Sequence, residues 1–184
     1  MKEQLQKDFY NSIKNLSLSQ KDIEIKKFCL NNFIDKGFPN RKEEDWKFSD
    51  LNQIIKKNIG ELSFYSEYKS TNKVDTSVFV DGLEHNKIVF INGRIEKIDF
   101  DYEQKNQIEI IDQSENINKF NNKNSLSDLN NAFTNKSFKI LVKKGYKLLK
   151  PLIIYHTSNS KIWSKNINLK LDFELDKDSS LRVI

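Results

Sequence analysis

The spacing of apolar residues changes along this chain from the period of a helix to the period of a strand. Near the start, apolar residues recur every three or four positions, as they do on one face of a helix. These residues are Leu5, Phe9, Ile13 and Leu16. In the last fifty residues apolar and polar side chains alternate instead, most clearly from Ile167 to Leu175. Helices followed by strands indicate an α+β protein.

Local signals mark a second helix in the first forty residues. Ser19 with Asp22 three positions later resembles a capping signal, so the helix is expected to begin just after Ser19. Gly37 follows Lys36 and Pro39 comes soon after, which predicts the end of this helix.

Strands are predicted from about residue 77 onward. Asn92-Gly93 separates two apolar runs and predicts a tight hairpin of residues 87–91 and 94–98. An Asn/Lys-rich loop at 116–124 leads to a short helix that Ser125 is expected to cap. The other predicted strands are 107–111, 138–142, 152–156, 167–175 and 181–184. A chain that stops within the last of these would leave an apolar edge, so we expect the protein to continue beyond Ile184.

Composition limits the class of protein. Leu, Ile, Val and Phe make up 57 of the 184 residues, which is enough for a folded core. The net charge of +5 is mild and only three basic residues are Arg, which argues against a nucleic-acid partner. The polar N-terminus and the short apolar runs predict no signal peptide and no membrane association. Cys29 has no second cysteine to pair with, and we expect a cytoplasmic protein.

The sequence lacks the common motifs of catalysis and metal binding. It has no glycine-rich phosphate loop, no CxxC, no HExxH and no GxSxG. The two histidines, His85 and His156, are far apart in the chain, and Cys29 lies in an apolar setting typical of a packed residue. We therefore expect a protein that is not an enzyme, with no catalytic residue, no metal ligand and no cofactor bound by this segment.

The most specific segment is residues 37–51. The segment begins with the residues that end the second helix. An acidic helical turn comes next, and an aromatic pair that is expected to anchor the chain follows it. Arg41 is spaced to reach Glu44 or Asp45, and Glu44 is spaced to reach Lys47. Trp46 is expected to supply buried area. On physical grounds alone the segment is a linker that an aromatic residue fastens to the next part of the chain.

This segment closely resembles the signature G-x-P-x-R-x-x-E-x-W-K-aromatic-[ST]-x-L near the N-terminus of the SufD family, a scaffold subunit of iron–sulfur cluster assembly. The matching residues are Gly37, Pro39, Arg41, Glu44, Trp46, Lys47, Phe48, Ser49 and Leu51. Three shorter segments resemble the family in the same order, and they contain Asn92-Gly93, Asn130 with Ala132, and Pro151. An Asp-Gly that often follows the alanine segment is replaced here by Asn135-Lys136.

The resemblance implies an N-terminal helical domain followed by the first rungs of a right-handed parallel β-helix. It divides the chain into a helical region with the tryptophan-containing linker at 1–75, a mixed region at 76–135, and the start of the β-helix at 136–184. It also implies a non-catalytic scaffold that pairs with a SufB-like subunit and, through a region beyond this segment, with a SufC-like ATPase. An iron–sulfur cluster would belong to the whole complex.

Two other classes remain open at the level of sequence. Parallel β-helices are common among carbohydrate-active enzymes, although those are usually secreted, whereas this chain has no signal sequence. A basic RNA-binding module is the third possibility, and it would bind with a steep dependence on salt.

Overall fold

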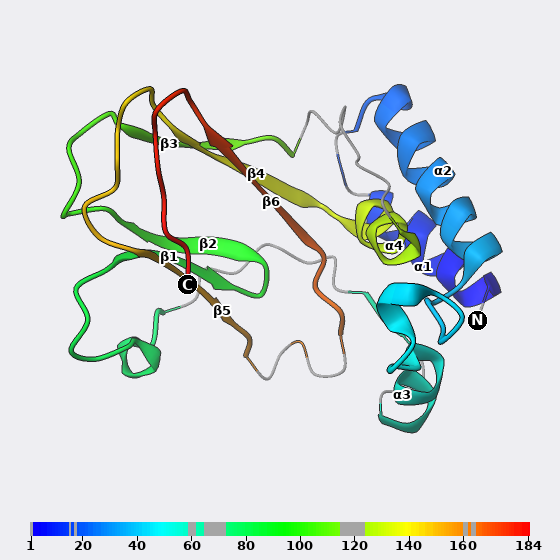
Figure 1. Ribbon diagram of the computed structural model, residues 1–184. Coiled ribbons are helices and arrows are strands. Elements are labelled where there is room, and N and C mark those ends of the chain that lie inside the picture. Colours follow the sequence, from blue (N-terminus) through cyan, green and yellow to red (C-terminus); the bar gives the residue numbers. More distant parts are fainter. Residues whose placement is uncertain are drawn as a thin grey trace. The chain divides into compact units, whose positions relative to one another are not determined.

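The computed structural model describes residues 2–14, 16, 18–58, 62–64, 73–114, 124–159, 162 and 165–184 (Figure 1). Within these residues the chain is α+β, as the change of apolar period predicts, with four α-helices and six strands. It divides into two compact units. A helical unit comprises Met1–Ser66, Ser114–Asn135 and Ser164–Lys170, and a sheet unit comprises Glu67–Gln113, Lys136–Trp163 and Leu171–Ile184.

The helical unit contains α1 (Lys2–Ile13), α2 (Gln20–Lys36), α3 (Leu51–Asn58) and α4 (Ser125–Phe133). The predicted first two helices are therefore confirmed. Helix α4 packs closely on α2, although about ninety residues separate them in sequence. Their apolar faces and that of α1 form one core, which consists of Leu5, Phe9, Cys29, Leu30, Phe33, Phe38, Leu129, Ala132 and Phe133.

Both ends of α2 are fixed by the residues that predicted them. Ser19 and Asp22 form a reciprocal capping box, in which each side chain binds the other's backbone N–H. Gly37 ends the helix at φ 73°, and its N–H donates to the Phe33 carbonyl at 2.7 Å. The predicted cap of α4 is wrong by one residue. Asn124 caps the helix by accepting from the Ser127 N–H at 2.9 Å, and Ser125 is the first helical residue.

The first sheet of the sheet unit has the order β2-β1-β5. Strands β1 (Asn86–Ile91) and β2 (Arg94–Asp99) form the predicted antiparallel hairpin. Asn92 and Gly93 both adopt positive φ, at 52° and 79°, as the tight turn requires. On its other side β1 pairs in parallel with β5 (Leu152–Thr157), from Asn86 opposite Leu152 to Ile91 opposite Thr157.

The second sheet has the order β3-β4-β6. Strand β3 (Ile108–Asp112) is antiparallel to β4 (Lys136–Val142). Strand β6 (Leu169–Leu175) runs in the same direction as β4 (Figure 1). The Asp176 N–H donates to the Val142 carbonyl at 3.0 Å just past the ends of both strands. Each sheet therefore has an antiparallel strand at one edge and a parallel pair at the other.

The last residues continue this parallel pattern beside β5. Lys147 lies opposite Ser180 and Leu152 opposite Val183, both in parallel bridges. The Leu152 N–H donates to the Arg182 carbonyl at 2.8 Å, and the Ile184 N–H donates to the Leu152 carbonyl at 2.9 Å. The strand predicted at 181–184 is present as these bridges and not as a continuous strand.

Strand β1 is buried on both faces. The ring of Phe90 lies 5.8 Å from that of Phe138 on β4, which brings the two sheets into contact. Ile88, Phe90, Ile140, Val142 and Leu152 are almost completely buried. The other face of β1 is covered by the segment that contains η2, a short 3-10 helix at Thr76–Val78.

Two sequence predictions have a different outcome. The alternation at 167–175 predicts one buried and one solvated face, but Phe173 and Leu175 on the apolar face are 42% and 48% exposed. The reason is that β6 is an edge strand, so its apolar side chains have neighbours on one side only. The predicted loop at 116–124 lies outside the described residues except for Asn124. No helix in the described part of the chain is long and apolar enough to cross a membrane.

Candidate functional site

The signature segment begins in the core of the helical unit. After the turn at Gly37, Phe38 is 5% exposed and its ring packs edge-on against Phe33, with ring centres 5.0 Å apart. Pro39 is buried as well. The first three signature positions thus serve the fold, since they end α2 and return the chain to the core.

The rest of the signature lies at the surface. Glu44 begins η1, a single 3-10 turn at Glu44–Trp46, and its carboxylate pairs with Lys47 at 2.8 Å, as the spacing predicts. Arg41 is exposed. The predicted burial of the aromatic anchor is only partly correct. Trp46 is half-buried, whereas Phe48 is 89% exposed with the Lys47 ammonium 5.3 Å from its ring centre.

The alanine segment lies on α4. Ala132 is completely buried against α2, where a larger side chain would not fit without displacing the core. The Asn130 carbonyl accepts from both the N–H and the hydroxyl of Thr134, at 2.7 and 2.6 Å, and its side chain donates to Leu169 at 3.3 Å. Both residues have structural roles in the helical unit.

A buried lysine caps the C-terminal end of α4. Lys26 on α2 is 0% exposed, and its ammonium donates to the carbonyls of Asn131 and Ala132 at 3.4 Å and to that of Thr134. These carbonyls are left without intrahelical partners at the helix C-terminus, where positive charge is favoured. Burial lowers the pKa of Lys26 to about 8, although Cys29 and Asp22 act in the opposite direction.

The two remaining signature segments occupy turns of the sheet unit. Asn92 binds the end of β5 twice, because its N–H donates to Thr157 at 3.1 Å and its side-chain oxygen accepts from the Asn159 N–H at 3.1 Å. Pro151 stands just before β5 and its carbonyl accepts from the Asn86 N–H at 2.8 Å. These contacts fix the two ends of the β1–β5 pair.

Beside Pro151, one carboxylate organises a polar corner. Glu103 accepts from the Asn86 side chain and the Tyr146 hydroxyl, both at 2.7 Å, and from the N–H groups of Leu149 and Lys150 at 3.1 Å. Burial alone would raise the pKa of Glu103, but these hydrogen bonds outweigh it and hold the pKa below its ordinary value. No local sequence pattern marks this residue, because its partners lie 17 to 47 positions away.

A second polar contact ties the segment before β1 to β5. The His85 ring donates from Nδ1 to the Leu83 carbonyl at 2.6 Å, so Nε2 is the acceptor for the Tyr155 hydroxyl at 2.8 Å. That hydroxyl also accepts from the Val80 N–H at 3.1 Å. His85 is therefore committed to a structural role within the sheet unit.

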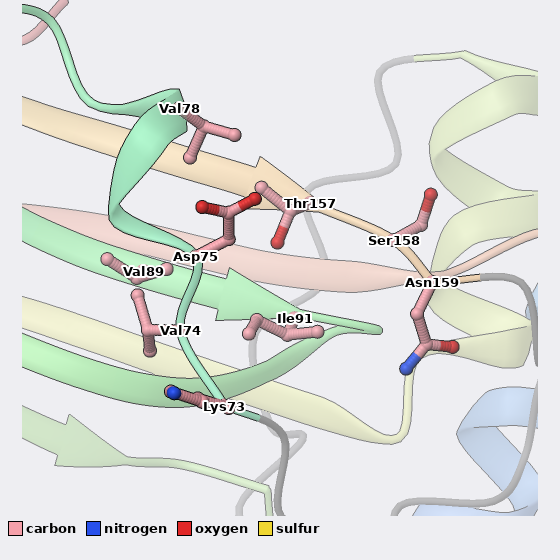
Figure 2. Close-up of a pocket in the computed structure, with 9 residues that line it drawn as sticks. All are labelled: Lys73, Val74, Asp75, Val78, Val89, Ile91, Thr157, Ser158 and Asn159. Atoms are coloured by element: carbon pink, nitrogen blue, oxygen red, sulfur yellow. The ribbon is translucent and has the colours of Figure 1, made fainter.

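A small cavity of about 270 Å³ lies between this segment and the first sheet (Figure 2). Figure 2 shows one wall on the extended segment that precedes η2 and another at the end of β5. Both apolar and polar side chains line it, namely Lys73, Val74, Asp75, Val78, Val89, Ile91, Thr157, Ser158 and Asn159. The polar part of this lining consists of Lys73, Asp75, Thr157, Ser158 and Asn159, and no histidine or cysteine belongs to it.

The described residues contain no group of three or more His, Cys, Asp or Glu side chains that could hold a metal ion. His156 is stacked on the buried Phe90 ring at 4.9 Å, and partial burial lowers its pKa. Cys29 is completely buried in the helical core.

The outer face of the second sheet carries an ordered set of charges. Lys143 on the turn after β4 pairs with Glu109 on β3 at 2.7 Å, and Lys139 on β4 pairs with Glu174 on β6 at 2.6 Å. Acidic, basic and acidic side chains therefore follow one another across β3, β4 and β6. Such cross-strand pairs stabilise a sheet modestly and also set which strand fits beside which.

Comparison of the chain with protein-family models and with curated proteins found no match. The structure itself defines an α+β protein whose conspicuous surfaces are an exposed aromatic segment, a small cavity and the edge of a charged sheet.

Proposed function

We propose that this chain is part of a non-catalytic scaffold built from parallel β coils. The observation that carries the proposal is the repeat of parallel pairing in both sheets. Lys147 is opposite Ser180 and Leu152 is opposite Val183, 33 and 31 positions further along, and β1 is opposite β5, with Asn86 facing Leu152 at an offset of 66. Parallel neighbours at similar offsets are what successive coils of a solenoid produce.

The order of the strands supports the same proposal. One coil would consist of β4 and β5, and the next of β6 and residues 180–184. The antiparallel strands β2 and β3 would then cover the first end of the stack of coils. Each of them lies at one edge of its sheet, and the parallel strands lie at the other edge. In this arrangement Phe138, Ile140 and Val142 on β4 and Leu171, Phe173 and Leu175 on β6 would line one interior. We propose the right-handed form, the hand of most parallel crossovers.

Within this class, the signature at residues 37–51 favours a SufD-like scaffold subunit of iron–sulfur cluster assembly. Its first positions have an evident role in the fold, but Arg41 and Phe48 are exposed, and an exposed aromatic ring contributes nothing to the core. We propose that the subunit pairs with a SufB-like protein and a SufC-like ATPase in the cytoplasm. The nascent cluster would belong to the assembled complex, and no residue of this segment is assigned to it.

The proposal is tested by co-expression. The protein, expressed with a tag from its natural gene, is purified together with untagged SufB-like and SufC-like proteins from the same genome. We expect all three to elute as one complex by size-exclusion chromatography with light scattering. If the protein elutes alone while the two other proteins elute together, the SufD-like assignment is wrong.

A second measurement separates the scaffold from the other classes. Binding to RNA that falls steeply with salt would favour the basic RNA-binding module. A loss of viscosity on incubation with uronate polymers would favour the carbohydrate-active class. The scaffold proposal expects neither result.

A further inference from the structure

The cavity in Figure 2 lies within the sheet unit, because all of its lining residues belong to that unit. Two apolar lining residues, Val89 and Ile91, come from β1, where alternate side chains point to the same face of the sheet. Two more, Val74 and Val78, come from the segment that covers this face. Branched aliphatic side chains therefore line the cavity from both of these sides, and its described lining contains no aromatic ring.

The size of the cavity limits what it can hold. An apolar cavity of about 150 Å³ in another protein holds benzene, which has six carbon atoms. At similar packing, the volume of about 270 Å³ accommodates a ligand of about ten non-hydrogen atoms. This is the size of a small metabolite and is too small for a nucleotide.

One wall of the cavity carries two opposite charges. Lys73 and Asp75 both line it, and neither forms an ion pair with another residue in the described part of the chain. The hydroxyl and the N–H of Ser77 donate to the Asp75 carboxylate, the N–H at 2.9 Å, and these bonds hold the pKa of Asp75 below its ordinary value. The wall therefore presents one carboxylate and one ammonium group.

The opposite wall adds uncharged polar groups. Thr157, Ser158 and Asn159 follow one another at the end of β5 (Figure 2). The Thr157 hydroxyl donates to the Phe90 carbonyl at 3.2 Å, so its oxygen can still accept from another donor. The Ser158 hydroxyl can donate or accept. This wall is compatible with either sign of charge on a ligand, so the discrimination comes from Lys73 and Asp75.

These two charges favour one class of ligand. An aliphatic carboxylate would pair with Lys73 but bring a second negative charge beside Asp75. An aliphatic amine would pair with Asp75 but bring a second positive charge beside Lys73. A zwitterion satisfies both, because the two residues are only two positions apart in an extended segment and the lysine side chain is long and flexible.

We infer that the cavity binds a free α-amino acid with a branched aliphatic side chain, such as leucine. Its ammonium group would lie at Asp75 and the Thr157 hydroxyl, and its carboxylate at Lys73. Its side chain would lie against Val89 and Ile91. Leucine has nine non-hydrogen atoms and fits the size of the cavity. The inference rests on the sheet unit alone and is independent of the SufD-like assignment.

The test is a titration of the ¹⁵N-labelled protein with four small molecules. Leucine carries both charges and the aliphatic body, whereas glycine lacks the body, isopentylamine lacks the carboxylate and 4-methylpentanoate lacks the amine. We expect leucine to shift the backbone amide signals of residues 73–78, 89–91 and 157–159 most, with a Kd of about 1 mM, as befits so small a ligand. The amine and the acid should bind at least threefold more weakly, and glycine at least tenfold more weakly.

Variants of the two charged residues make the result specific. Asp75→Asn removes the charge but keeps an oxygen that can accept from Ser77, and in this variant 4-methylpentanoate should bind as tightly as leucine. In Lys73→Met, isopentylamine should bind as tightly as leucine. Asp81→Asn is the matched control, because Asp81 is an exposed aspartate on the same segment but does not line the cavity. This control should leave all four affinities unchanged.

Four outcomes would overturn the inference. The first is the absence of saturable shifts with leucine at tens of millimolar. The second is equal binding of leucine, the amine and the acid, which would show that the charges play no part. The third is shifts that map away from the cavity, and the fourth is an equal loss of leucine binding in the Asp75 and Asp81 variants.

Discussion

Two ionisable residues show how burial and hydrogen bonding act in opposite directions in this protein. Lys26 is a cation in the helical core, and burial lowers its pKa to about 8 despite its three carbonyl partners. Glu103 is a half-buried anion whose hydrogen bonds outweigh burial and lower its pKa. Charge is therefore unfavourable at Lys26 and favourable at Glu103, and stability should depend on pH at both positions.

For Lys26 the dependence lies at alkaline pH. Between pH 8 and 10.5 the unfolded chain keeps the proton that the folded protein has lost, so the free energy of unfolding rises with pH. The contribution amounts to about 3 kcal/mol at most. Urea unfolding of the unmodified protein and of Lys26→Met at pH 7 and pH 10 measures it. We expect the unmodified protein to gain stability relative to the variant at pH 10, and a difference that does not vary with pH would contradict the assignment.

For Glu103 the dependence lies at acid pH. The folded-state pKa is below the ordinary value of 4.5, so the stabilisation is complete above that value and is lost as the pH falls through the folded pKa. Glu103→Gln should cost about 1 kcal/mol at pH 7, since the carboxylate is partly solvated. The cost should shrink as the pH is lowered toward 3. Unfolding curves at both pH values decide this, and an equal cost at both would show that the charge is unimportant.

At the scale of single elements, the sequence predicts those features that neighbouring residues determine. The capping box of Ser19 and the stop at Gly37 bound α2 correctly, because both act within four residues of the helix end. Asn92-Gly93 likewise predicts its hairpin. The contacts of Lys26 with α4 could not be predicted, since they join residues more than 100 positions apart. The presence of an aromatic residue also does not predict whether its side chain is buried. Phe48 is exposed, although the motif led us to expect an anchor there.

The signature segment offers a matched pair of substitutions at this scale. Phe38→Ala removes a ring that packs on Phe33 and should lower the free energy of unfolding by about 3–5 kcal/mol. Phe48→Ala removes a ring that is 89% exposed and should change it by less than about 0.5 kcal/mol. Thermal or urea unfolding of both variants tests the assignment of core and surface. A large loss of stability in Phe48→Ala would place that ring in the core.

At the scale of the whole molecule, alternation along a strand tells which face is apolar but not whether another strand covers it. For this reason the alternation at 167–175 correctly predicts a strand but overestimates the burial of its apolar side chains. The polar corner at Glu103 and the clamp between His85 and Tyr155 are also properties of the assembled sheets. We propose that both contacts fix the turns between successive parallel strands, so that the stack holds its register.

That register is the central claim, and paired cysteines measure it most directly. In a Cys29→Ser background, Lys147→Cys with Ser180→Cys places two thiols on neighbouring parallel segments, within reach of a disulfide. We predict rapid cross-linking within the monomer under mild oxidation. Lys147→Cys with Asp178→Cys, shifted by two positions, should cross-link far more slowly. Equal rates for the two pairs, or faster cross-linking of the shifted pair, would contradict the parallel pairing of Lys147 with Ser180.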